Sequence, residues 1–435
     1  MRSCILYVGL WMVLPFIGRT QTPLSLEECY RQAETHSPQA GQTRLIQEAT
    51  DLQIKLLNRN YVPQSRLNGQ ATWQSDVTSV PIKLPNFEIS PPPKDQYKLT
   101  LDVTQSIWDG GLTEKQKSAA LANQQVEQQR VVVDLYQIRE QVSNLYFGAL
   151  FAERQLRNFE IIQKELNAKL LKTKASVQNG IAIRSNVLSL EVRILEIEQQ
   201  LLETQKRRAS ALEGLSLLTG TTIDTNTKFV ETRVETQHLA SLQIVQNTAS
   251  QQAEITRPEL RLFDVQKQNL AVNEQLIKAK NLPKLSAFAT GGYGRPGLNF
   301  LATQFKTYFI GGVQLQIPLT HLYTNSQGLE IQQLRVNQQR IERQRESFLL
   351  ATQVRLASQR QEVGRLQALV ESDRKLIDIR GTIRKASESQ LDNGIITASD
   401  YLTELDNEDT ARQNLILHEI QLLQAQNNLR ITSGN

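Results

Sequence analysis

The chain is poor in the residue types on which most catalytic and metal sites depend. Its 435 residues include two cysteines, two methionines, three tryptophans and four histidines. The histidines His36, His238, His321 and His418 have neither metal-ligand spacing nor a thiolate partner, and no serine lies in a nucleophile-elbow motif. Gly292 to Gly297 fits the dinucleotide string G-x-G-x-x-G, but no helix pattern follows it. The sequence therefore predicts no enzyme, no metal and no cofactor.

Apolar runs long enough to cross a membrane as a helix are missing after the N-terminus. Cys4 to Ile17 is apolar, follows Arg2 and precedes small residues, which predicts a secretory signal peptide over residues 1–20. The alternative is a signal anchor, but a spanning helix needs about 20 apolar residues. If the exported chain crosses a membrane, it must do so as β-strands. Cleavage would leave Cys29 alone, so no disulfide can form within the mature chain.

Charge of either sign is not concentrated anywhere in the sequence. The net charge is +5 and no block of lysine and arginine stands out, so nucleic acid is not an expected partner. Apolar residues make up 40% and charged residues 21% of the chain, which indicates a folded protein and not a disordered one.

The chain does contain an internal duplication. Ser37-Pro38 recurs as Arg257-Pro258 at an offset of 220 residues, and Asn179-Gly180-Ile181 recurs as Asn393-Gly394-Ile395 at an offset of 214. An offset that changes in steps indicates a repeated unit with a few loop insertions. Each copy reads as a helix, two strands, a very long helix, a break and a further helix.

Four segments alternate between apolar and polar residues, which is the pattern of a half-buried strand. In the first of them, Leu67, Gly69, Ala71 and Trp73 share one face and polar residues share the other. Each segment is about ten residues long, the length of a tilted strand that crosses a membrane. The predicted strands cover residues 65–76, 97–108, 284–294 and 307–319.

Long helices are expected after each pair of strands. Leu112 to Gln178 contains no proline and shows the 3-4 apolar spacing of coiled coils. One unbroken helix of this extent would be about 100 Å long. The breaks at Asn179-Gly180 and Asn393-Gly394 predict two helical hairpins. The expected organisation is a first repeat over 21–220, a linker over 221–237 and a second repeat over 238–435, with hairpin tips at 179–186 and 393–400.

Four strands with one apolar and one polar face suit a membrane barrel with lipid outside and water inside. Four strands cannot close a barrel, and an open sheet edge is not tolerated in lipid. The chain is therefore expected to oligomerise, and three copies would supply twelve strands. The predicted fold class is mainly α with a membrane β-barrel part. It consists of a duplicated helix–β-hairpin–long helical hairpin unit, whose trimeric 12-stranded barrel continues into a long α-helical coiled-coil barrel.

Local motifs at matching places in the two copies point to a known family. Gln105 to Gly111 reads QSIWDGG where a strand turns into the long helix, and Gln316 to Leu319 reads QIPL at the counterpart position. Similar residues follow the glycine at both helix breaks, over Gly180–Leu188 and Gly394–Leu402. On these motifs and the order of elements, the chain resembles the TolC family of outer-membrane channel-tunnels over everything that follows the signal peptide.

The resemblance implies a homotrimer in the outer membrane of a Gram-negative bacterium, with a periplasmic helical extension. It implies passive export of small molecules or polypeptides in a tripartite efflux or type I secretion system. The implied partners are a periplasmic adaptor (membrane fusion) protein, an inner-membrane transporter of the RND, ABC or MFS type, and outer-membrane lipid. A periplasmic coiled-coil adaptor or scaffold is the alternative, although an adaptor normally has one helical hairpin.

The resemblance also places functional residues at the two hairpin tips. In the family these turns face the adaptor, and a ring of aspartates narrows the pore. Asp400 matches the pore aspartate, while Asn186 is its uncharged equivalent in the first copy. Thr397 to Asp400 has capping-box spacing, so Asp400 also suits a helix cap. The expected adaptor contacts are Gly180, Ile181, Ala182, Ile183, Arg184, Ser185, Gly394, Ile395, Ile396, Thr397, Ala398 and Ser399.

Overall fold

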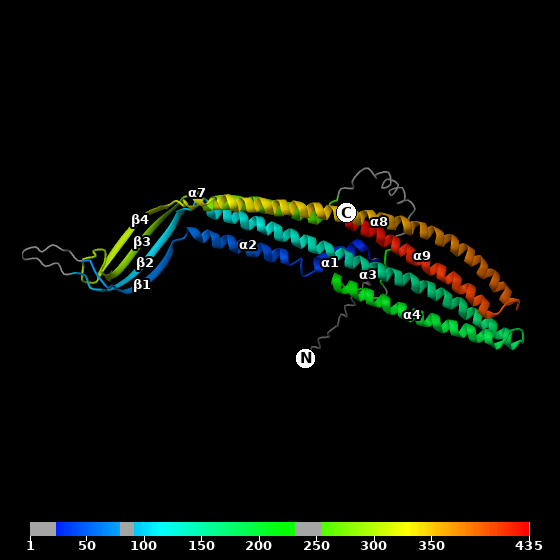
Figure 1. The fold of residues 1–435 in the computed structure, drawn as a ribbon. Coiled ribbons are helices and arrows are strands. Elements are labelled where there is room, and N and C mark those ends of the chain that lie inside the picture. Colours follow the sequence, from blue (N-terminus) through cyan, green and yellow to red (C-terminus); the bar gives the residue numbers. More distant parts are fainter. Residues whose placement is uncertain (1–22, 79–90, 226, 231–254, 435) are drawn as a thin grey trace, which may run out of the picture. The chain divides into compact units, whose positions relative to one another are not determined.

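A helix, two strands, a long helix and a return helix follow one another twice along the chain (Figure 1). The first copy comprises α1 (Leu26–His36), α2 (Gln42–Asn58), β1 (Gln64–Trp73), β2 (Asp95–Trp108), α3 (Leu112–Gln178) and α4 (Arg184–Thr219). The second comprises α6 (Pro258–Lys280), β3 (Lys284–Arg295), β4 (Lys306–Gln316), α7 (Thr320–Thr324), α8 (Ser326–Asp392) and α9 (Ala398–Ser433). The long helices α3 and α8 both have 67 residues, and the return helices α4 and α9 both have 36. These equal lengths confirm the predicted duplication.

The structure is a computed structural model that describes residues 23–78, 91–225, 227–230 and 255–434. The predicted signal peptide over residues 1–20 lies outside the described residues. Contacts divide the chain into two units. The tip unit comprises the described parts of Met1–Ser37, Ile138–Ala253 and Ser358–Ile431, and the sheet unit comprises those of Pro38–Gln137, Glu254–Ala357 and Thr432–Asn435.

The sheet unit contains one antiparallel sheet with the strand order β1-β2-β3-β4. Leu67 pairs with Leu101 on the neighbouring strand, and Leu101 pairs with Gly291. Because side chains alternate across a strand, the adjacent row that begins with Arg66 and Asp102 lies on the opposite face. The sheet therefore has one apolar face and one polar face, as the alternation predicts.

Two strands end earlier than the alternation suggests. β1 ends at Trp73, although the amide of Gln74 still donates to the carbonyl of Lys94 at 2.9 Å. β4 ends at Gln316, three residues before Leu319. Pro318 has no amide hydrogen to donate, so the hydrogen-bonded ladder cannot continue through it.

The tip unit is built from helices that pack along apolar stripes. Its α1 begins with Ser25, whose hydroxyl accepts from the amide of Glu28 at 3.2 Å. The carboxylate of Glu28 accepts from Arg31 and Gln32 instead of the N-cap amide. One buried cluster in this unit consists of Phe159, Ile162, Leu166, Leu190, Ile194, Ile197, Leu201, Ala398, Tyr401, Leu402 and Leu405.

None of the helices within the described residues is long and apolar enough to cross a membrane.

The described part of the expected linker packs against the first copy. Phe229 is 4% exposed and its ring lies edge-on to Tyr146, with 5.0 Å between the ring centroids. Phe229 also forms a parallel β-bridge with Leu24. After α4, the chain around Phe229 therefore packs against the first described residues of the tip unit.

Candidate functional site

Two glycine turns close the helical hairpins of the tip unit. Gly180 and Gly394 have φ angles of 73° and 70°, values that residues with a side chain adopt only at a cost. The amide of Ile181 donates to the carbonyl of Ser176, and the amide of Ile395 donates to that of Gln390, both at 2.9 Å. These bonds, which join each amide to the carbonyl five residues earlier, are those of the Schellman motif that ends many helices. The repeated Asn-Gly sequence thus gives the same turn twice.

Each turn presents an apolar side chain to solvent. Ile181 is 69% exposed and Ile395, its counterpart in the second copy, is 71% exposed. Ile183 is also exposed, whereas Ala398 is fully buried and Ile396 packs against the core cluster. The exposed isoleucines are available to a partner, and the buried Ala398 and the partly buried Ile396 hold the second turn to the helices.

The carboxylate of Asp400 caps α9 and remains exposed. It accepts hydrogen bonds from the amide and the hydroxyl of Thr397 at 2.9 and 2.8 Å, while the amide of Asp400 donates to the same hydroxyl at 3.3 Å. The hydroxyl and then the amide of Thr397 hold the pKa of Asp400 below its usual value. The capping interpretation is confirmed, and it leaves a fully ionised carboxylate at the tip.

Asn186 connects the turn of the first copy to that of the second. Its side-chain oxygen accepts from the amide of Ala398 at 3.3 Å. The tip unit therefore brings Asn186 and the start of α9 together, although 212 residues separate them in sequence. Arg184 is exposed next to this contact, and the described residues form no ion pair with it.

A charged group centred on the buried Lys169 lies behind the turns, and the sequence analysis did not identify it. The side chain of Lys169 is 6% exposed and its ammonium lies 2.7 Å from Asp392 and 3.3 Å from Glu388. Lys172 also contacts Asp392, at 2.6 Å. Burial opposes ionisation of Asp392, but the two lysines outweigh it and keep the pKa of this carboxyl below its usual value. These pairs link α3 to the end of α8.

A second charged group lies further along the same helices. The side chain of Glu408 is 3% exposed and accepts from Arg384 and Arg412, each at 2.5 Å. Burial opposes its ionisation, but both arginines hold the pKa of Glu408 below its usual value. Glu408 is therefore a buried carboxylate whose charge depends on these two guanidinium groups.

Asp409, the next residue, has the opposite electrostatic balance. It is 3% exposed and accepts from the side-chain amide of Asn158 at 2.7 Å. Burial raises the pKa of Asp409 despite this hydrogen bond and the charge of Arg193. The sequence does contain a signal for Asp409. The 3-4 spacing of Leu402 and Leu405 predicts an apolar residue at position 409, and an aspartate stands there instead.

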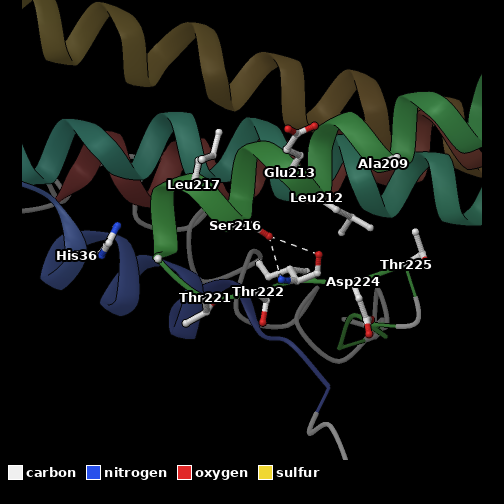
Figure 2. Close-up of a pocket in the computed structure, with 12 residues that line it drawn as sticks. His36, Ala209, Leu212, Glu213, Ser216, Leu217, Thr221, Thr222, Asp224 and Thr225 are labelled. Carbon is white, nitrogen blue, oxygen red and sulfur yellow. Dashed lines mark hydrogen bonds between the residues drawn. The ribbon is translucent and has the colours of Figure 1, made fainter.

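A separate hollow lies where the chain leaves α4 (Figure 2). Its volume, as bounded by the described residues, is about 630 Å³, and its walls include Leu212, Ser216 and His36. The amide of Ile223 donates to the hydroxyl of Ser216 at 2.9 Å, one of the dashed contacts in Figure 2. None of the residues predicted to be functional lines this hollow, so we treat it as part of the connection between the copies.

Known proteins share both the sequence pattern and the fold. A family model described as "Outer membrane efflux protein" matches residues 29–221, and no curated protein matches the chain in sequence. Among solved structures, VceC, an outer membrane protein of Vibrio cholerae, has 15% identity and a TM-score of 0.64, covering 94% of this chain and 96% of VceC.

Two further channels give similar values. CusC has 14% identity and a TM-score of 0.64, covering 94% of this chain and 92% of its own. The open state of MtrE, an outer membrane channel of Neisseria gonorrhoeae, has 14% identity and a TM-score of 0.62, covering 94% and 89%. At these identities the structural likeness shows the fold.

The sequence match, the duplicated order of elements and the fold agree on one assignment. They make the protein an efflux channel of the Gram-negative outer membrane with a periplasmic helical extension, and they do not favour the adaptor or scaffold alternative. Over residues 29–221 the chain matches the outer membrane efflux protein family, and its fold is that of the outer-membrane channels.

Proposed function

We propose that three copies of this chain form one continuous channel, which exports small molecules or polypeptides passively from the periplasm to the exterior. The observation that carries this proposal is the four-stranded sheet. Its apolar face is exposed at Leu67, Leu101, Phe309 and Val313, and within the described residues its edge strands β1 and β4 have no further strand neighbour. Lipid suits the apolar face, and only closure with other copies satisfies both edges.

An apolar stripe on α4 supports assembly of the helical part. Leu188, Val192, Leu195 and Leu202 follow 3-4 spacing and are 51–59% exposed. Such a stripe on a long helix is the seam of a coiled coil, and it requires a facing helix. We assign that role to a helix of a neighbouring copy.

The oligomeric mass of the mature protein in detergent tests this assembly. We expect multi-angle light scattering, corrected for bound detergent, to give the mass of three chains. A matched variant, Leu195→Glu, places a charge in the exposed stripe and should shift the mass toward one chain. A monomer in the unmodified protein would contradict the proposed barrel.

The exposed isoleucines of the two turns are proposed to dock the periplasmic adaptor. Ile181 and Ile395 occupy the same position in the two copies and are equally exposed. An adaptor with apolar residues on helical hairpins could therefore contact both turns in the same way. The adaptor would connect the channel to an inner-membrane transporter of the RND, ABC or MFS type, which supplies the energy.

Asp400 is proposed to line the constriction at the tip. Three ionised carboxylates around a threefold axis would focus a negative potential and favour cations. We expect Asp400→Ala to shift the reversal potential in a potassium chloride gradient toward anions, and to weaken block by trivalent cations. Asp400→Glu, which keeps the charge, should behave as the unmodified channel. An unaltered reversal potential in Asp400→Ala would place Asp400 outside the constriction.

A further inference from the structure

The glycine-rich string Gly292 to Gly297 begins at the hairpin end of β3, and Gly292 and Gly294 lie on the polar face of the sheet. A Cβ added at Gly292 would lie 2.2 Å from the ring of Tyr308, so this ring covers the glycine. A Cβ added at Gly294 would lie 2.7 Å from the carbonyl oxygen of Tyr97. Both positions therefore require glycine, because neighbouring atoms approach the backbone closely.

Two lysines flank Gly294 in the sheet. Lys98 pairs with Gly294 on one side and Lys306 pairs with it on the other, so all three share one row across the sheet. Both lysines are exposed, and their backbones lie about 10 Å apart, two strand spacings. No ion pair within the described residues neutralises either ammonium. The ammonium of Lys98 lies 5.8 Å from the ring centroid of Tyr308.

Charge on the polar face of the four strands is strongly unequal. This face carries four cations and one carboxylate: Arg66, Lys98, Lys284, Lys306 and Asp102. Hydrogen bonds from Asn68, Thr100 and Thr290 already occupy the oxygens of this carboxylate.

The remaining charges of the sheet do not change this balance. Asp102 lies opposite Arg66 in the register and also attracts Lys98, so one carboxylate faces several cations. On the apolar face, Arg295 and Asp95 pair with one another. The polar face that carries Lys98 and Lys306 is therefore positive overall.

We propose that Lys98 and Lys306 of each copy form a cationic collar inside the outer mouth of the channel, which binds and admits anionic solutes. This inference rests on the proposed trimeric channel. The row lies near the hairpin end of the strands, away from the ends that lead into the helices (Figure 1). If the helices are periplasmic, the hairpins face the exterior. Six ammonium groups around one lumen would concentrate anions there, and lysine is an established phosphate ligand.

The collar and the tip act on opposite charges. Asp400 would favour cations at the periplasmic end, whereas the collar would favour anions at the outer end. A solute that carries both charges would be attracted at both ends, whereas a purely anionic solute would be repelled at Asp400 and attracted at the collar. The collar thus indicates a chemical class of cargo, namely solutes with at least one anionic group. The tip alone would select against such solutes.

External block by inorganic tripolyphosphate tests the collar in the working channel. Protein is added to one chamber of a planar bilayer and tripolyphosphate to the other, which the hairpins face, at low ionic strength because salt screens these charges. We expect Lys98→Gln/Lys306→Gln to raise the half-blocking concentration roughly tenfold or more. Lys98→Arg/Lys306→Arg, which keeps both charges, should retain the block. Unchanged block in the glutamine variant would overturn the proposal.

Calorimetric binding of tripolyphosphate to the solubilised protein gives a second readout that needs no current. Binding should weaken roughly tenfold in the glutamine variant and persist in the arginine variant. Equal binding in all three proteins overturns the collar even if they conduct. Trimers or currents that are missing from the unmodified protein would instead count against the proposed channel, so the two failures are distinguishable.

Discussion

Replacing Gly394 with valine is expected to abolish export while trimers remain in the outer membrane. Gly394 has a φ of 70° and nothing lies within 4 Å of an added Cβ, so the penalty comes from the backbone alone. A β-branched residue at this angle costs about 1–2 kcal/mol or more, and the turn must rearrange to avoid the cost. The exposed Ile395 would then lose the position at which it is proposed to meet the adaptor. Drug susceptibility of a complemented deletion strain measures the effect.

Gly364→Val is the matched control for this experiment. Gly364 also has open space around an added Cβ, but it lies within α8 at an ordinary helical φ. Valine is a slightly better helix former than glycine, by a few tenths of a kcal/mol, so the helix should remain intact and resistance should persist. Wild-type resistance in the Gly394→Val strain would contradict the role given to the turn. Gly180→Val tests the turn of the first copy in the same way.

Replacing Arg384 with methionine should produce the largest loss of stability in the tip unit. The guanidinium contacts Glu408, whose side chain is 3% exposed, and also lies near Glu388 and Glu165. Methionine would leave the buried carboxylate with Arg412 alone. Removing one partner of a buried ion pair typically costs about 3–5 kcal/mol, and the remaining arginine should keep the cost near the lower value. Amide hydrogen exchange along residues 384–412 measures the local loss.

The double variant Arg384→Met/Glu408→Met separates charge from packing. Because it removes the carboxylate as well, it should recover most of the protection that the single variant loses. Lys375→Met is a control, since Lys375 pairs with Glu371 on the surface of α8 and exposed pairs contribute little. If the single and double variants lose the same protection, the buried charge is not what holds these helices together.

Much of the fold follows from local patterns in the sequence. The 3-4 spacing from Leu112 to Gln178 predicts one long helix, and α3 covers these residues. The repeated Asn-Gly dipeptides predict tight turns, and both glycines have positive φ. Alternation predicts two hairpins, which pair into a single sheet. These patterns are informative because each depends on neighbouring residues and recurs in both copies.

The charged features could not be predicted in the same way. Glu408 and Asp409 are adjacent in the sequence, but their carboxyl groups behave differently. Arg384 helps to lower the pKa of Glu408, whereas burial raises the pKa of Asp409. Which partner reaches each carboxylate depends on how α8 and α9 pack. The row of Lys98 and Lys306 likewise depends on the pairing of β2, β3 and β4, which alternation alone does not give. Capping of α9 by Asp400 was predictable because its partners lie within three residues.

Conductance of the mature protein in a planar lipid bilayer tests the central claim most directly. We predict that detergent-extracted protein gives stable single-channel steps, which are small because the tip narrows the path. Asp400→Ala should change the ion preference of these steps without abolishing them. A protein that remains soluble without detergent and never produces a step would contradict the account, because its sheet would then not lie in a membrane.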